Sequence, residues 1–195
     1  AFTHFCNVLT YGQPYTYCVA NDEKSLGVPY VYHTDPNGKP ARETVISNYE
    51  NIVKDLLEAE NIIDPDYVAK SVRPSLVDAN AAVNISTIQA LLSRVYLYMG
   101  EWQKSADYAT KVINNSNYKL WTADELPTVW TKDVAGNGGE VIMEFYGKKS
   151  NDYYNSWTDI SYVTNPNGYA DCGVSNDLYS LYADNDVRKA LHRTD

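Results

Sequence analysis

The strongest constraint on the fold lies between residues 90 and 121, where an apolar pattern of helical period meets one glycine and resumes directly after it. The segment reads ALLSRVYLYMGEWQKSADYATKVINNSNYKLW. The pattern predicts helices over residues 86–99 and 102–114. Because glycine adopts the left-handed conformation that ends a helix at little cost, Gly100 predicts a tight corner between them. The two helices should therefore form an antiparallel hairpin.

Four aromatic side chains surround this corner: Tyr96, Tyr98, Trp102 and Tyr108. They either pack inside a helical repeat or face a ligand. Leu92, Ser93, Tyr96, Gly100 and Trp102 follow the tetratricopeptide-repeat pattern in order, although Gln89 and Ala109 stand where aromatic residues are usual. The match favours a packing role for Tyr96 and Trp102. The second helix should bury the face that carries Trp102, Ala106, Ala109 and Ile113.

Two more helices are expected before the hairpin. Phe2, Phe5, Cys6 and Leu9 share one helical face, and Gly12 ends that pattern. A helix over 44–63 follows, with Thr44 as its N-cap.

The helix over 86–99 should begin with a capping box formed by Ser86 and Gln89. Residues 15–43 and 67–85 are expected to be irregular. Residues 140–146 (EVIMEFY) predict a short strand and 147–174 a loop, and a last short helix should begin near Asn176. The predicted fold is mainly α, with tetratricopeptide-like helical repeats, long irregular loops and a short strand segment.

Charge and hydropathy exclude several functions. The net charge of −9 comes without a basic patch, so the sequence gives no support for nucleic-acid binding or for an anionic membrane surface. No run of eighteen apolar residues is present. The three cysteines are scattered, so neither a disulfide framework nor a zinc site is expected, and buried free thiols are the default interpretation.

The sequence marks neither catalysis nor a cofactor. It contains no GxSxG, Walker or GxGxxG motif, and His4, His33 and His192 lack metal-ligand spacing. The acidic run from Asp184 has Lys189 where a calcium loop needs glycine. Asp186 and Arg188 are instead expected to form a structural ion pair.

Tyrosine is the unusual feature of the composition, with 18 Tyr and 4 Trp against 3 Phe. These side chains gather among Asn, Asp and Ser in residues 146–169. Sugars have apolar C–H faces, on which an aromatic ring stacks, and hydroxyl rims, to which amides and carboxylates hydrogen-bond. The candidate ligand-binding residues are Trp157, Tyr153, Tyr154, Asn155, Asp152 and Tyr162.

Two alternatives to this site remain open. The 146–169 segment could be an Ω-loop held by its own aromatic side chains. A second candidate is the tyrosine-containing segment 15–32, for which a covering loop over the helices is the simpler interpretation.

Five segments in the same order resemble the SusD/RagB family of Bacteroidetes outer-membrane lipoproteins. They are AFTHFCNVLTYGQPYT, LGVPYV, RETVISNYENIVKDLLEAENII, ALLSRVYLYMGEWQKSADYATKVI and VSNDLYSLYADNDVR. The resemblance implies one SusD-like domain over 1–195 that is incomplete at both ends. Residues 1–121 would be a helical-repeat scaffold, and 122–195 would be a loop-rich segment with a short helix.

The resemblance also implies a function. Such a protein binds oligosaccharides without catalysis, sits on the cell outer membrane through a lipid anchor absent from this fragment, and works with a SusC-like TonB-dependent transporter. The alternatives are a peptide-binding member of the family, a helical-repeat scaffold that binds only proteins, and an accessory domain of a glycoside hydrolase.

Overall fold

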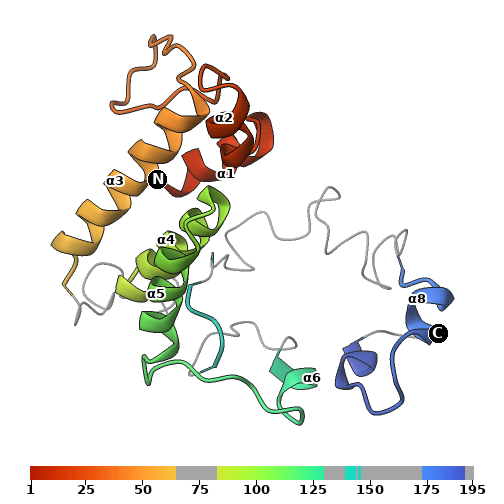
Figure 1. Cartoon of the computed structure of the whole chain (residues 1–195). Coiled ribbons are helices and arrows are strands. Elements are labelled where there is room, and N and C mark those ends of the chain that lie inside the picture. The colour runs from red at the N-terminus through yellow and green to blue at the C-terminus, as the bar shows by residue number, and fades with distance from the viewer. Residues whose placement is uncertain (65–82, 130–138, 144, 146–172, 192–195) are drawn as a thin grey trace. The chain divides into compact units, whose positions relative to one another are not determined.

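A computed structural model describes residues 1–64, 83–129, 139–143, 145 and 173–191 of the chain (Figure 1). It divides the chain into two compact units, Ala1–Tyr118 and Lys119–Asp195. Each unit is described by itself.

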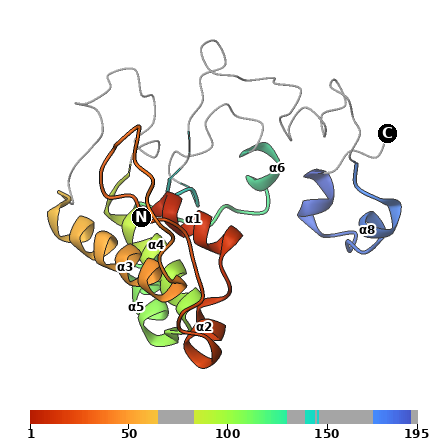
Figure 2. The same cartoon turned by 90° about the horizontal axis from the view of Figure 1, so that it is seen from above.

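The first unit is helical. Its elements are α1 (Phe2–Tyr11), α2 (Tyr15–Asn21), α3 (Val45–Ile62), α4 (Ile85–Met99) and α5 (Trp102–Ile113). Figures 1 and 2 both show α3 beside the α4–α5 hairpin. The predicted mainly helical fold is confirmed, including the helices expected over 44–63, 86–99 and 102–114. Among the described residues, extended pairing is limited to one isolated bridge between Leu26 and Thr44.

The helix α2 corrects the expectation that residues 15–43 are irregular throughout. It has only seven residues, too few for a stable isolated helix, so its stability must come from packing. Cys18 is fully buried, and the ring of Tyr15 lies 5.0 Å from that of Tyr49 on α3. Local sequence signals do not contain these contacts, which is why the sequence pattern missed the helix.

Of the two predicted N-terminal helix caps, one is confirmed and the other is wrong. The Thr44 hydroxyl accepts a hydrogen bond from the Ser47 amide at 3.1 Å, as predicted. The predicted Ser86–Gln89 capping box is wrong, because Asn84 caps α4 and forms a reciprocal box with Thr87. Asparagine caps a helix as well as serine does, so the type of residue alone did not distinguish the two positions.

The α4–α5 hairpin closes at Gly100, whose φ is 78°. The two helices approach each other closely at Ser93 and Ser105. Each serine hydroxyl donates to the backbone carbonyl of the other residue at 2.9 Å. Leu92, on the adjacent turn, is fully buried as the repeat pattern requires.

The buried face of α5 differs from the prediction. Ser105 and Val112 are buried, whereas Trp102 is 68% exposed, Ile113 is 77% exposed and Ala106 is also exposed. The helix turns its serine face toward α4 because only small side chains permit that close approach. The predicted packing role is therefore wrong for Trp102, while Tyr96 is buried as expected.

A polar network joins α3, α4 and α5 at Glu60. The Glu60 carboxylate accepts hydrogen bonds from Gln89 at 3.0 Å, Tyr108 at 3.0 Å and Lys111 at 3.2 Å. The Tyr108 ring also stacks on that of Tyr96, with centroids 5.7 Å apart, and lies beneath the Lys111 ammonium group. Three of the four corner aromatics therefore join helices to one another, because the Tyr98 ring also meets that of Phe5 on α1 edge-on at 5.6 Å.

The buried apolar cluster of the first unit draws on α1, α2, α3 and α4 and on the segment before α3, and the partly buried Tyr108 of α5 packs against it. Its members are Phe5, Val8, Cys18, Val28, Tyr30, Val45, Tyr49, Ile52, Leu56, Ile88, Leu92, Val95 and Tyr96.

The face that α1 buries differs from the predicted face. Phe5 is buried as predicted, but Phe2, Cys6 and Leu9 are exposed, and Val8 occupies the core instead. Two overlapping apolar stripes run along α1, and spacing alone does not decide which of them is covered. The expectation of buried thiols therefore holds for Cys18 but not for Cys6, and Cys172 lies outside the described residues.

The buried Asn48 on α3 holds the segment that precedes the helix. Its carboxamide accepts from the Val28 amide at 2.7 Å and donates to the Val28 carbonyl at 3.0 Å. A Cβ on Gly27 would overlap this carboxamide, so the position requires glycine. These two bonds satisfy a side chain that is otherwise buried among apolar groups.

The second unit has little regular structure in its described part. It contains α6 (Leu126–Val129), α8 (Asn176–Ser180, capped by Ser175) and η3 (Val187–Leu191). The predicted Asp186–Arg188 ion pair is confirmed, at 2.6 Å. The strand predicted over 140–146 is wrong for residues 140–143 and 145, which are irregular. There, the Glu140 carboxylate accepts from the Trp121 amide at 2.9 Å.

Candidate functional site

The ligand-binding residues predicted in the 146–169 segment lie outside the described residues. They are Asp152, Tyr153, Tyr154, Asn155, Trp157 and Tyr162. Their role remains a prediction.

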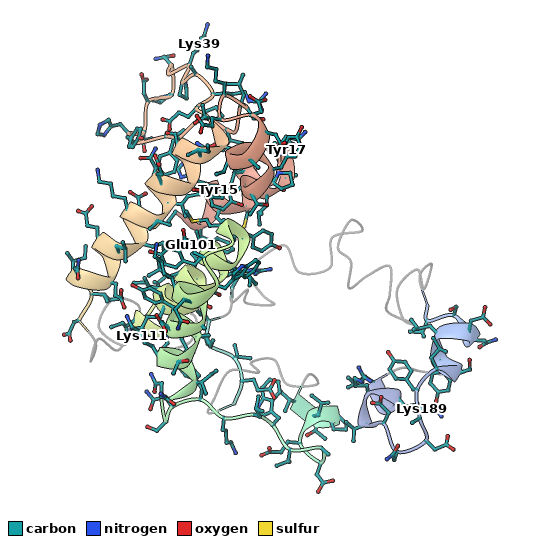
Figure 3. The ribbon with its side chains drawn as sticks, in the orientation of Figure 1. Tyr15, Tyr17, Lys39, Glu101, Lys111 and Lys189 are labelled. Carbon is teal, nitrogen blue, oxygen red and sulfur yellow. The ribbon has the colours of Figure 1, made fainter. Side chains whose placement is uncertain are left out.

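The second predicted region, 15–32, is described. Tyr15 and Tyr17 lie on α2 (Figure 3). Residues 26–32 then run in extended form over α1 and α3, where Tyr30 is buried and Tyr32 is 61% exposed. Residues 26–32 are thus a covering segment, in line with the simpler interpretation, whereas residues 15–21 form a helix, and Tyr32 is the member of the Tyr30–Tyr32 pair that solvent reaches.

Three rings form a ladder at the end of this segment. The His4 ring of α1 stacks on Tyr30, with centroids 3.9 Å apart and planes 19° apart. The Tyr30 ring lies 5.2 Å from that of Tyr32 at 46°. We call His4, Tyr30 and Tyr32 the aromatic ladder. Its outermost ring is supported from behind and open to solvent, which is the arrangement that a stacking ligand requires.

Carboxylates and an amide lie beside the ladder. The Tyr30 hydroxyl donates to Asp55, and the Tyr32 hydroxyl donates to Glu43 over 3.4 Å. The other oxygen of Glu43 accepts from Ser47 at 2.7 Å and from the Asn51 amide at 3.0 Å. These contacts fix the positions of the acceptors next to the exposed ring.

The pKa values of the ladder follow from burial and from these carboxylates. Burial and the hydrogen bond to Asp55 raise the pKa of Tyr30. Desolvation and the adjacent Glu43 raise the pKa of Tyr32. Both phenols therefore remain protonated donors at neutral pH. Burial lowers the pKa of His4 against the opposing effect of Asp55 and Glu43, which favours neutral imidazole.

The arrangement offers a neutral ring platform with acceptors at its edge, which matches the faces and rims of a polyol. No group of three or more potential metal ligands was found within the described ranges. The rings of the ladder and the carboxylates bonded to its phenols can bind and orient a ligand.

Sequence reasoning placed Tyr30 and Tyr32 in a candidate region but did not find the ladder. Their i, i+2 spacing in an extended segment was an available signal, since it puts both residues on one side. His4 lies 27 residues before Val31, the sequence singled it out only for lacking metal-ligand spacing, and no local pattern links it to Tyr32. Only the fold brings α1 to this segment.

In the described part of the chain, no helix has the length and apolar character needed to cross a membrane.

Comparisons with solved structures give a consistent result. A SusD superfamily protein from Bacteroides thetaiotaomicron is 35% identical, with a TM-score of 0.60, over 76% of this chain and 29% of that one. Another from Bacteroides vulgatus is 25% identical, with a TM-score of 0.72, over 96% of this chain and 40% of that one. A third, from Bacteroides fragilis, is 22% identical with a TM-score of 0.54 over 72% of this chain and 29% of that one, and supports the fold alone.

This chain therefore spans 29% and 40% of the length of the first two structures. No protein-family model and no curated protein matches the sequence.

Proposed function

The chain belongs to the SusD superfamily, and from this premise we propose that it is part of a non-catalytic, surface-exposed protein that binds oligosaccharides. The observation that carries the proposal is the 35% identity to a SusD superfamily structure over 76% of the chain. In this proposal the whole protein is held on the outer membrane by a lipid anchor. It delivers its ligand to a SusC-like TonB-dependent transporter.

Two surfaces are proposed to contact the sugar. The first is the segment with Trp157, whose ring would stack on a sugar face while Asp152 and Asn155 bond the rim. The second is the aromatic ladder, where Tyr32 would stack and Glu43 would accept from hydroxyl groups. Both combine aromatic rings with hydrogen-bonding groups, but only the ladder lies in the described part of the chain.

Calorimetry with a panel of oligosaccharides tests this function. Shallow sugar sites bind in the micromolar to millimolar range, or about 4–8 kcal/mol. Removing a central stacking ring should remove at least about 1 kcal/mol, so Trp157→Ala should abolish measurable binding. Tyr32→Ala should weaken binding if the ladder contributes. Tyr11→Ala is the matched control, because Tyr11 is 72% exposed on α1 and belongs to neither surface.

The outcomes separate the alternatives. Circular dichroism must first show that each variant is folded. A folded parent protein that binds no oligosaccharide contradicts the glycan proposal, and heat released on titration with peptides would favour a peptide-binding member. Equal binding by Trp157→Ala and the parent protein would place the site elsewhere.

A second candidate function is protein binding by the helical scaffold. The observation that favours it is the apolar stripe on α5, where Trp102, Ala106 and Ile113 are exposed at helical spacing. In this case a purified SusC-like transporter should bind the parent protein but not the Trp102→Glu variant, and titration with sugars should release no heat. If the transporter binds the Trp102→Glu variant as well as the parent protein, this stripe is excluded as the contact.

A further inference from the structure

The segment between Gly27 and Thr44 is held firmly at its inner end. Asn48 binds both backbone groups of Val28, and the Arg42 guanidinium donates to the Gly27 carbonyl at 2.6 Å and the Leu26 carbonyl at 2.8 Å. Residues 31–41 are all exposed, and Lys39 lies at the far tip of this loop (Figure 3). The position of the outer part of the loop, which carries Tyr32, therefore depends on the contacts at the point where the segment leaves the core.

His4 makes the contact at that point. Its Nε2 accepts a hydrogen bond from the Val31 amide at 3.1 Å, and its ring stacks on Tyr30. An imidazole nitrogen accepts only when it carries no proton, so the proton of neutral His4 must be on Nδ1. Nδ1 is buried and has no hydrogen-bond partner. A second proton on the ring would therefore have to go to Nε2, the atom that accepts from Val31.

Charged and titratable groups face His4 from each element packed against it. Asp55 is on α3, and Tyr30, Tyr32 and Glu43 belong to the segment between Gly27 and Thr44. Burial opposes protonation of His4 and the two carboxylates favour it, and the pKa of His4 is lowered overall from 6.5.

We propose that His4 is a pH-sensitive positioning residue for Tyr32: neutral His4 holds the Val31 amide and the ring ladder in place, and protonation of Nε2 releases both. Once protonated, Nε2 is a hydrogen-bond donor that faces the Val31 N–H. Because that N–H is also a donor, the hydrogen bond between them is lost. The stabilisation by the Val31–His4 hydrogen bond is fully present above the unfolded-state pKa of His4, about 6.5, and is lost as the pH falls through the lower folded-state pKa. The consequence for sugar binding rests on the proposed function, whereas the release itself does not.

Amide hydrogen exchange of Val31, followed by NMR from pH 7.5 down through the titration of the His4 ring signals and corrected for the intrinsic rate, tests the release. Protection of Val31 should fall about tenfold at the acid end, the change expected for losing one hydrogen bond of about 1.4 kcal/mol. The Val28 amide, held by Asn48, is the internal control and should keep its protection.

Two variants sharpen the result. His4→Phe keeps an aromatic ring against Tyr30 but has no acceptor, so Val31 should be unprotected at every pH. His4→Gln offers an acceptor that does not titrate, so protection of Val31 should be restored and become independent of pH. Unchanged protection of Val31 while the His4 ring takes up its second proton, or equal protection in His4→Phe and the parent, would overturn the proposal.

Calorimetry with the oligosaccharide that binds best adds a separate readout. Affinity of the parent should fall at acid pH, and the His4→Gln variant should lose this dependence. If Val31 responds as expected and no oligosaccharide binds, the proposed function fails and the role of His4 stands. If sugar binds and Val31 does not respond, the role of His4 fails and the proposed function stands.

Discussion

Ser93 and Ser105 each donate a hydroxyl to the other's backbone carbonyl at 2.9 Å, and this reciprocal pair sets the distance between α4 and α5. A larger side chain at Ser105 would force the helices apart. Ser105→Leu should therefore lower the free energy of unfolding by about 1–3 kcal/mol. Urea denaturation followed by circular dichroism measures the change.

Ala106→Leu is the matched control for Ser105→Leu, because residue 106 is on the same turn of α5 and exposed. It should change the free energy of unfolding by less than about 0.5 kcal/mol. A loss at Ala106 as large as that at Ser105 would contradict the assignment of the buried face.

Leu92 and Leu97 offer a second comparison within one helix. Leu92 is fully buried and Leu97 is 48% exposed, both on α4. Leu92→Ala should cost about 2–5 kcal/mol, since it removes packed methyl groups and leaves a cavity. Leu97→Ala should cost clearly less, and denaturation of the two variants side by side gives the difference. Near-zero loss at Leu92 would mean that the hairpin packs in another way.

The Glu60 network should make stability depend on pH. Burial alone would raise the pKa of Glu60, but the hydrogen bonds from Gln89, Lys111 and Tyr108 outweigh it, and the pKa is lowered from 4.5. A carboxylate whose folded-state pKa is depressed adds stability above its unfolded-state pKa, and this stability is lost as the pH falls through the folded-state value.

Thermal unfolding of the parent protein and of Glu60→Gln between pH 3 and 7 tests this dependence. The difference in stability between the two should be largest near pH 7 and shrink as the pH falls below about 4.5, where Glu60 of the unfolded chain begins to be protonated, toward the lower folded-state pKa. A difference that stays constant over this range would mean that the charge of Glu60 contributes nothing through the network.

No hydrolysis of polysaccharides is expected from the purified protein, because no paired acid and nucleophile is marked in the sequence. A reducing-end assay with several polysaccharides measures turnover. Activity that one Asp or Glu substitution abolishes would overturn the binding-protein proposal, whereas activity that survives all such substitutions would indicate a contaminating hydrolase.

The sequence by itself determined the positions of the main helices, because their signals are local. The apolar period, the hydroxyl of Thr44 and the left-handed Gly100 act within a few residues of one another, and α3, α4 and α5 lie where they were predicted. The Asp186–Arg188 pair, only two residues apart, was likewise visible in the sequence.

Only the tertiary structure decided which face each helix buries and where the aromatic ladder lies. An apolar stripe such as Trp102 to Ile113 has the same spacing whether or not anything covers it, and two serines, not the stripe, face α4. His4 reaches Val31 across 27 residues because α1 packs beside the segment that covers α3. Contacts of that kind arise from the packing of elements distant in the sequence, so no local pattern of residues encodes them.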